Sequence, residues 1–327
     1  MITRRALAAP LVISLAPHLA AVARAQAPEW PSQPIRMIMP YAAGGPTDVI
    51  ARLLADALSQ RLSQRVLVEN RTGAGGNIGA ASVARAAPDG HTFLFTNTGH
   101  SVNRALYARL DYEPATDLVP VTIVAESPMA LLVPNASPDR TVADFVARLR
   151  AAPDRLTYAS AGAGGALQLV SLLFQRAAGV RMTEVSYRGS APAMQDLVAG
   201  RLDMLFDAGI SAFPVALSGQ ARALCVSGAT RSPVMPDVLT IAEAGFPAGT
   251  FSVWQVVLAP ARTPPEILER MQREIAVILG DGPLRARLIE MGAERILAND
   301  PAEARRYVDA EMTRWAAVLR EAGVQPQ

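Results

Sequence analysis

The chain has 327 residues, of which 50% are hydrophobic and 18% charged, and its formal net charge is +2. It contains no lysine, which excludes a Walker-A phosphate loop and Schiff-base chemistry, because both need that amine. The single cysteine, Cys225, excludes an internal disulfide, and its apolar neighbours predict a buried thiol rather than a nucleophile.

Residues 1–25 have the composition of a secretory signal peptide. Arg4 and Arg5 precede an apolar run rich in alanine and leucine, and a small-x-small triplet ends at Ala25. Two prolines and a histidine interrupt the run, so it falls short of the roughly 20 apolar residues of a membrane-spanning helix. We therefore predict cleavage near Ala25 and a periplasmic protein; both Sec and Tat export fit the segment.

Removal of this segment changes what the charge and the length predict. It takes away three arginines and no acidic residue, so the formal net charge falls from +2 to −1. A nearly neutral chain gives no reason to expect nucleic acid or an anionic membrane as a partner. About 300 residues then remain, a length that suggests two domains.

Residues 35–95 alternate between strand and helix patterns. Apolar strands are expected at Ile35–Met39, Arg65–Glu69 and His91–Phe95. The apolar spacing between Ile50 and Leu62 predicts an amphipathic helix, and a glycine-rich turn leads into an alanine-rich helix that ends by Ala87. This βαβαβ order implies a parallel sheet covered by helices.

A second unit of the same kind follows. Its strands are expected at Ala130–Val133, Leu156–Ala159, Glu184–Tyr187 and Met204–Asp207, and its helices at Val142–Ala151, Leu167–Ala178 and Ala191–Ala199. The chain then continues with a long strand, Phe251–Ala259, and with helices at Pro265–Leu279, Pro283–Met291 and Pro301–Ala322.

This order of elements predicts an α/β protein with two lobes, each with a central, mainly parallel sheet flanked by helices. We expect the chain to cross between the lobes twice, at Val121–Val133 and at Phe251–Ala259. The first lobe would comprise residues 26–127 and 250–327, and the second lobe residues 128–249.

Three glycine-rich loops each join a predicted strand to a predicted helix. In residues 41–48 and 159–166, glycines would let the backbone approach a ligand, and the following helix would offer free N–H groups to an anion. Thr47 or Asp48 could instead be an ordinary helix cap. The loop at residues 73–79 fails the dinucleotide spacing at Ile78, which favours a structural turn.

The sequence lacks the usual catalytic patterns. It has no G-x-S-x-G motif, and His91 and His100 have no cysteine or carboxylate at metal-ligand spacing. His91 fits the start of a strand and is expected to be structural. His100 follows the end of a strand, where it could face a ligand or support the loop, and Asp207 follows another strand at the expected cleft. We predict no cofactor and no metal.

Several ordered strings resemble the Bug proteins, the substrate-binding components of tripartite tricarboxylate transporters. They are PIR (34–36), GGxTD (44–48), VENRxGAGGNIG (68–79), APDG (87–90), YRGSAPA (187–193), RSP (231–233), PDV (236–238) and EAGF (243–246). The resemblance extends over residues 30–323. It implies a type II periplasmic binding protein fold, with a ligand cleft between two lobes.

Members of this family hold a carboxylate between the two glycine-rich loops, with backbone amides, hydroxyls and bridging waters. By position and by the loop patterns, the candidate ligand-binding residues are Tyr41, Gly44, Gly45, Thr47, Asp48, Asn97, Thr98, His100, Ser160, Gly164, Gly165, Gln168 and Asp207.

The sequence departs from the family pattern after Gly165. Where relatives carry a Thr/Ser-His pair and later a glutamate, this chain has Leu167, Gln168 and Leu172. A lost hydroxyl beside the carboxylate would cost about 1–3 kcal/mol unless water or Gln168 compensates. A more apolar or an amide-bearing solute is therefore compatible with the sequence.

The resemblance implies a receptor, expected as a monomer, that binds a small carboxylate in the periplasm and passes it to membrane transporter subunits. It does not imply an enzyme. Two other functions are compatible with the sequence: a ligand-binding sensor partner of a signalling system, and an enzyme that uses Asp48, His100 and Asp207 in the cleft.

Overall fold

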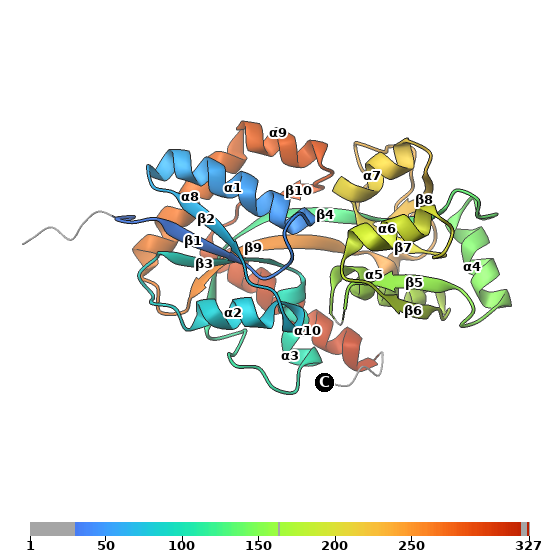
Figure 1. Ribbon diagram of the computed structural model, residues 1–327, viewed down its shortest axis with the longest axis horizontal. Helices are drawn as coiled ribbons and strands as arrows, with labels where there is room; N and C mark the ends of the chain where they lie inside the picture. The colour runs from blue at the N-terminus through green and yellow to red at the C-terminus, as the bar shows by residue number, and fades with distance from the viewer. Residues whose placement is uncertain (1–29, 163, 322–325, 327) are drawn as a thin grey trace, which may run out of the picture.

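The protein is described by a computed structural model that covers residues 30–162, 164–321 and 326. Two lobes lie side by side along the long axis (Figure 1). The predicted signal peptide, residues 1–25, lies outside the described residues. Within the described ranges, no helix combines the length and the hydrophobicity that a bilayer crossing needs.

The first lobe begins with the predicted βαβαβ unit, which is confirmed. Its elements are β1 (Ile35–Met39), α1 (Pro46–Leu62), β2 (Val66–Asn70), the 3-10 turn η1 (Ala74–Gly76), α2 (Asn77–Ala84) and β3 (Thr92–Asn97). β1 lies between β2 and β3 and pairs with both in parallel. Because helices cover both faces of this sheet, β1 is almost wholly apolar and buried.

Two long strands run through both lobes: β4 (Leu118–Pro134) and β9 (Ser252–Pro260). They contain the two predicted crossings and pair with each other in antiparallel fashion over 118–128 and 252–260. β9 also pairs antiparallel with β3, and the short β10 (Arg295–Ile296) pairs antiparallel with β4. The central sheet is therefore mixed rather than mainly parallel, because one strand leaves the first lobe and the other returns to it.

The second lobe is built on the far end of β4. Its elements are α4 (Val142–Ala151), β5 (Thr157–Ser160), α5 (Ala166–Ala178), β6 (Thr183–Ser186), α6 (Ser190–Val198), β7 (Leu205–Ala208), α7 (Gly209–Leu217) and β8 (Ala221–Val226). β7 and β8 pair antiparallel with β4, on residues 129–134, while β5 and β6 pair in parallel. The four strands predicted for this region are all present.

The elements that were not predicted include β8, α7 and a short helix α3 (Gly99–Leu106), besides the two-residue β10 and the turn η2 (Pro247–Gly249). α7 contains Pro214 and α3 begins with a run of poor helix formers, so local propensity opposes both helices. Tertiary packing outweighs it in α3, where Val102 and Leu106 belong to the core that the second lobe forms. α3 thus links the two lobes near the cleft.

The chain ends with the 3-10 turn η2 (Pro247–Gly249) and the helices α8 (Pro265–Gly280), α9 (Pro283–Glu290) and α10 (Pro301–Glu321). α8 and α9 cover the first lobe, whereas α10 runs from the first lobe towards the second (Figure 1). Trp315 of α10 is fully buried edge-on against Phe251, in the core of the second lobe. The predicted lobe boundaries at 127/128 and 249/250 stay a prediction, and α10 is an element that both lobes share.

Candidate functional site

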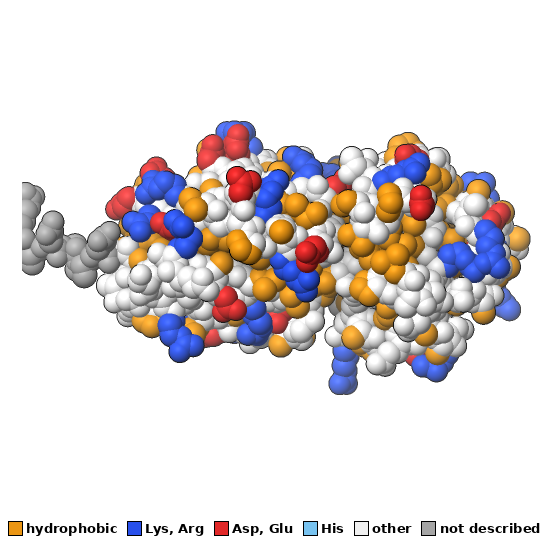
Figure 2. All heavy atoms as spheres, turned by 90° about the horizontal axis from the view of Figure 1, so that it is seen from above, with side chains coloured by type: hydrophobic (Ala, Val, Ile, Leu, Met, Phe, Trp, Pro, Cys, Tyr) orange, Lys and Arg blue, Asp and Glu red, His pale blue; other side chains and the backbone are white. Residues whose placement is uncertain are grey.

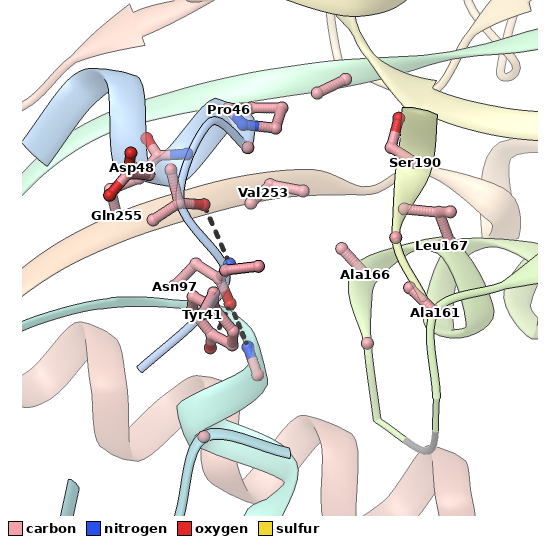
Figure 3. A pocket seen from close by; sticks show the side chains of 18 of the residues that line it. Tyr41, Pro46, Asp48, Asn97, Ala161, Ala166, Leu167, Ser190, Val253 and Gln255 are labelled. Atoms are coloured by element: carbon pink, nitrogen blue, oxygen red, sulfur yellow. Dashed lines mark hydrogen bonds between the residues drawn. The ribbon is translucent and has the colours of Figure 1, made fainter. Parts of the chain in front are cut away.

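A cavity of about 670 Å³ lies between the lobes. The amino ends of α1, α3 and α5 line it together with β4 and β9. In Figure 3, Tyr41, Asn97 and Gln255 lie on the wall of the first lobe, and Ala166, Leu167 and Ser190 on the opposite wall. Seen from above, a groove separates the lobes, with hydrophobic side chains along its second-lobe side (Figure 2). A small solute with both polar and apolar parts fits this lining.

The predicted site residues separate into two sets. Tyr41, Gly45, Thr47, Asp48, Asn97, Gly164, Gly165 and Asp207 line the cavity. The other five candidates are not among the described residues that line the cavity: Gly44, Thr98, His100, Ser160 and Gln168. The central residues of both predicted loops therefore line one cavity, whereas several candidates that flank them in the sequence do not.

Asp48 holds the first-lobe loop in place. Its carboxylate accepts hydrogen bonds from the Gly44 N–H (2.9 Å), from Arg52 (2.9 and 3.2 Å) and from Asn70 Nδ2 (2.8 Å). Burial alone would raise the pKa of this carboxyl, but the hydrogen bonds from Arg52, Gly44 and Asn70 hold the pKa below its usual value. With its oxygens occupied by protein donors, Asp48 shapes the loop and leaves little capacity for a ligand.

Asn97 connects three parts of the first-lobe wall. Its Oδ1 accepts hydrogen bonds from the Tyr41 hydroxyl (2.8 Å) and the Gly99 N–H (2.9 Å), and its Nδ2 donates to Thr47 Oγ1 (3.1 Å). Burial raises the pKa of Tyr41 to about 12, so this phenol remains a donor at neutral pH. Because the Thr47 oxygen accepts from Asn97, the Thr47 hydroxyl proton is left free to donate into the cavity.

Helix amino ends supply backbone donors from both walls. Gly45 is the N-cap residue of α1 and Gly165 that of α5, so no side chain of the cap residue accepts a hydrogen bond from the first amides of either helix. The first amides of a helix have no intrahelical acceptor and carry the positive end of the helix dipole. The amides of Thr47 and Leu167 therefore offer an anion-binding arrangement from opposite lobes.

Gln168 supports the second-lobe loop. Its Oε1 accepts a hydrogen bond from the Gly164 N–H (2.9 Å), and its Nε2 donates to Glu184 (3.0 and 3.2 Å). Gln168 therefore does not replace the hydroxyl that the family pattern would place at position 167. From this loop and the start of α5, the side chains that face the cavity are apolar and belong to Ala161, Ala166 and Leu167, whereas Arg188 lines the cavity from the next loop, between β6 and α6.

His100 and Thr98 support α3 rather than the cavity wall. Thr98 Oγ1 accepts a hydrogen bond from the Trp254 N–H (3.1 Å), and the His100 ring stacks on Tyr112 with 6.5 Å between ring centroids. Burial lowers the pKa of His100 to about 4, so the ring is neutral at physiological pH. Of the two roles considered for His100, the geometry favours support of the loop. His91 also lies away from the cavity, beside Trp30.

Asp207 is buried in the wall of the second lobe. Its carboxylate accepts hydrogen bonds from the Ser190 and Ser211 hydroxyls and from the Ala208 N–H. Burial raises the pKa of Asp207, and these three donors offset only part of that effect. No arginine or histidine of the described chain forms an ion pair with it, so its negative charge opposes that of an anionic solute.

We therefore expect Asp207→Asn to strengthen the binding of an anionic solute by roughly 3- to 10-fold at neutral pH. In the wild type, affinity would rise as the pH falls through the raised pKa, because Asp207 takes up a proton and loses its charge. Titration calorimetry over a range of decreasing pH measures this, with the exposed Asp237→Asn as the control. Weaker binding by Asp207→Asn throughout that range would show that the carboxylate itself contacts the solute.

The sequence reasoning missed Ser190 and Gln255, which both line the cavity. Ser190 lies in the YRGSAPA string and begins α6, shortly after the end of β6, and a polar residue at such a strand-to-helix junction is the signal that could have identified it. Gln255 is the one amide in an otherwise largely apolar crossing strand, and that irregularity could have revealed it. In the described residues, no three His, Cys, Asp or Glu side chains come together to hold a metal ion.

Comparison with known proteins gives consistent matches over most of the chain. The family model for the tripartite tricarboxylate transporter family receptor matches residues 50–324. Protein BugT from Bordetella pertussis is 36% identical over 303 residues, which cover 90% of this chain and 91% of BugT.

Two solved structures are similar along their whole length. R. palustris Rpa4515 with adipate has 37% identity and a TM-score of 0.86, and the match covers 91% of this chain and 100% of that one. MatC (Rpa3494) from Rhodopseudomonas palustris with bound malate has 34% identity and a TM-score of 0.81, covering 89% of this chain and 100% of MatC.

Proposed function

Because this chain belongs to the tripartite tricarboxylate transporter family of receptors, we propose that it binds a small carboxylate in the cavity between its lobes. The expected family, the periplasmic-binding-protein fold and the receptor role are confirmed by the matches. The observation that carries the proposal for this site is that helix amino ends of opposite lobes line one cavity, beside a hydroxyl with a free proton.

In this proposal the carboxylate lies between the amino ends of α1 and α5. It accepts hydrogen bonds from the Thr47 hydroxyl and from the first amides of each helix, so no arginine is needed to neutralise it. The apolar side chains of Leu167 and Ile50 then contact the rest of the solute. The adipate of Rpa4515 and the malate of MatC, both small carboxylates, support this class of solute.

The protein would act in the periplasm, after export by the signal peptide and cleavage near Ala25. It would close its lobes on the solute as a monomer and release it unchanged to the membrane subunits of a transporter. A binding role without catalysis is supported by the receptor matches and by the cavity-lining carboxylates Asp48 and Asp207, whose oxygens accept hydrogen bonds from protein donors.

Thr47→Val tests the proposed carboxylate site. We expect it to weaken binding about 10-fold, because the solute carboxylate loses a donor while the side-chain volume is kept. Isothermal titration with a panel of mono-, di- and tricarboxylates measures the effect, and Thr47→Ser should restore most of the affinity. Absence of binding by the wild type across the panel would refute the proposal, as would a Thr47→Val protein that binds as tightly as the wild type.

A further inference from the structure

Gln255 is a buried polar side chain in the cavity wall that has no hydrogen-bond partner among the described residues. It lies on β9, is only 3% exposed and lines the cavity. Its Oε1 is buried without a hydrogen-bond partner, and its Nε2 forms no hydrogen bond with the described residues. Buried amide groups in proteins are nearly always hydrogen-bonded, so an unpaired carboxamide in a binding cavity points to a missing ligand group.

The sheet register places this carboxamide beside the proposed carboxylate site. Gln255 pairs with Asn97 on β3 and with Ala125 on β4. Residues opposite each other on neighbouring strands project on the same face, so the Gln255 and Asn97 side chains are neighbours. The Asn97 Oδ1 already accepts from Tyr41 and Gly99, and its Nδ2 uses one of its two N–H groups to donate to Thr47. Gln255 is the adjacent amide whose donors and acceptor are all without a partner among the described residues.

We propose that Gln255 is a specificity-determining residue that hydrogen-bonds an oxygen substituent, hydroxyl or oxo, carried on the carbon chain of the solute close to its carboxylate. This inference rests on the proposed function, because the position of Gln255 is given relative to a carboxylate at Thr47. The class of solute it selects is a hydroxy or oxo carboxylate.

The neutrality of the carboxamide decides the kind of substituent. Gln255 carries no charge, and its strand neighbours Asn97 and Ala125 carry none, so these strands offer no opposite charge to a second charged group of the solute. The arginine that lines the cavity, Arg188, belongs to the second lobe, between β6 and α6. A carboxamide both donates and accepts hydrogen bonds, and either end can face the cavity after rotation of the amide. A hydroxyl on the solute can both accept from the amide N–H and donate to the amide oxygen, whereas an oxo group can only accept from the N–H.

Because the Gln255 amide is unpaired, we expect the protein to bind a carboxylate without the oxygen substituent more weakly than the same carboxylate with it. A solute that carries the oxygen satisfies the amide, whereas one without it leaves the amide buried and unpaired. Sites that hydrogen-bond a substrate hydroxyl reject the analogue lacking it much more strongly than an apolar pocket rejects an extra methylene. We expect a preference of at least about 10-fold for the oxygenated member of a matched pair.

Matched pairs of carboxylates and a near-isosteric variant test this proposal. Isothermal titration compares succinate with malate, glutarate with 2-hydroxyglutarate, and butyrate with 3-hydroxybutyrate, on the wild type and on Gln255→Met. In the wild type the hydroxylated member of a pair binds more tightly, and in Gln255→Met the difference within the pair disappears. Gln220→Met, in an exposed turn, should keep the wild-type preference.

The stability of the unliganded variant separates a binding role from a structural one. Gln255→Met removes a buried polar group that has no hydrogen-bond partner in the part of the chain that the structure describes, so the Tm of the variant without ligand should equal or exceed that of the wild type. A clear fall in Tm would mean that Gln255 supports the fold, and would overturn the proposal.

The remaining outcomes also decide the question. Equal weakening of both members of each pair by Gln255→Met would mean that Gln255 contacts the carboxylate, which overturns the inference and leaves the receptor function intact. An unchanged preference in Gln255→Met overturns it as well. If the wild type binds no carboxylate, the proposed function fails, and the inference fails with it.

Discussion

Gly164→Val is expected to weaken solute binding by about 100-fold or more. Gly164 has a φ of +75°, and a Cβ at this position would lie 2.2 Å from Leu106 Cδ1 and 3.0 Å from Val102 Cγ2. Both atoms belong to side chains of α3 that are buried and have little room to move aside, so the second-lobe loop would have to shift away from that helix. The amino end of α5 would move with the loop, and the carboxylate would lose the donors of one wall. Titration calorimetry measures the loss.

Gly219→Val is the matched control for this substitution. Gly219 has nearly the same backbone conformation, with a φ of +73°, but a Cβ there meets nothing within 4 Å. Both variants therefore carry the same left-handed strain, on the order of 1–3 kcal/mol, and only Gly164→Val adds the collision with α3. Wild-type affinity in Gly164→Val, or an equal loss in both variants, would contradict a role for the contact between the loop and α3.

Trp315→Ala is expected to lower the free energy of unfolding by about 3–5 kcal/mol, the largest stability effect that we predict for a single side chain. Trp315 is fully buried, packs edge-on against Phe251 at 5.6 Å, and donates from its Nε1 to Glu311 Oε2 (3.1 Å). The same Glu311 oxygen accepts from Trp254 Nε1 (3.2 Å) on β9. Truncation therefore opens a cavity and weakens the attachment of α10 to the second lobe.

Urea unfolding followed by circular dichroism measures the change in stability. Val277→Ala on α8 is the control, because it also shortens an apolar helix residue but one that is 56% exposed, and it should change stability by less than about 0.5 kcal/mol. A loss below about 1 kcal/mol in Trp315→Ala would show that the end of α10 is not part of the cooperative core.

The sequence predicted the regular elements of this fold because the physical pattern of each is local. β1 is a short, fully buried parallel strand and therefore reads as an unbroken apolar run. α1 has an apolar stripe at helical spacing, and a proline at its first position marks its beginning. α3 and α7 were missed because their own residues disfavour helix, and only contacts with distant segments stabilise them.

The part of the site that is formed by backbone groups could be predicted from the sequence. The loops with Gly45 and Gly165 can be recognised in the sequence because glycine precedes an amphipathic helix, and both loops line the cavity. The direction of a side chain depends on which partners reach it, and those partners are remote in sequence. Gln168 looked available to a ligand, yet Gly164 and Glu184 occupy its amide. The availability of Gln255 depends on the register of three strands, which no local pattern contains.

The continuity of β4 and β9 limits how the lobes can move. Both strands pass between the lobes while hydrogen-bonded to each other from Leu118 to Pro128 on β4. In the proposed closure, rotation inside a regular part of this ladder would break its rungs, so the bending has to occur at its register shifts, near Val121 and Val124, or where it ends at Pro128. Bending of this ribbon on the proposed closure would store elastic free energy that favours reopening. In that proposal the dissociation rate of the solute depends partly on the stiffness of these two strands, and not only on the contacts inside the cavity.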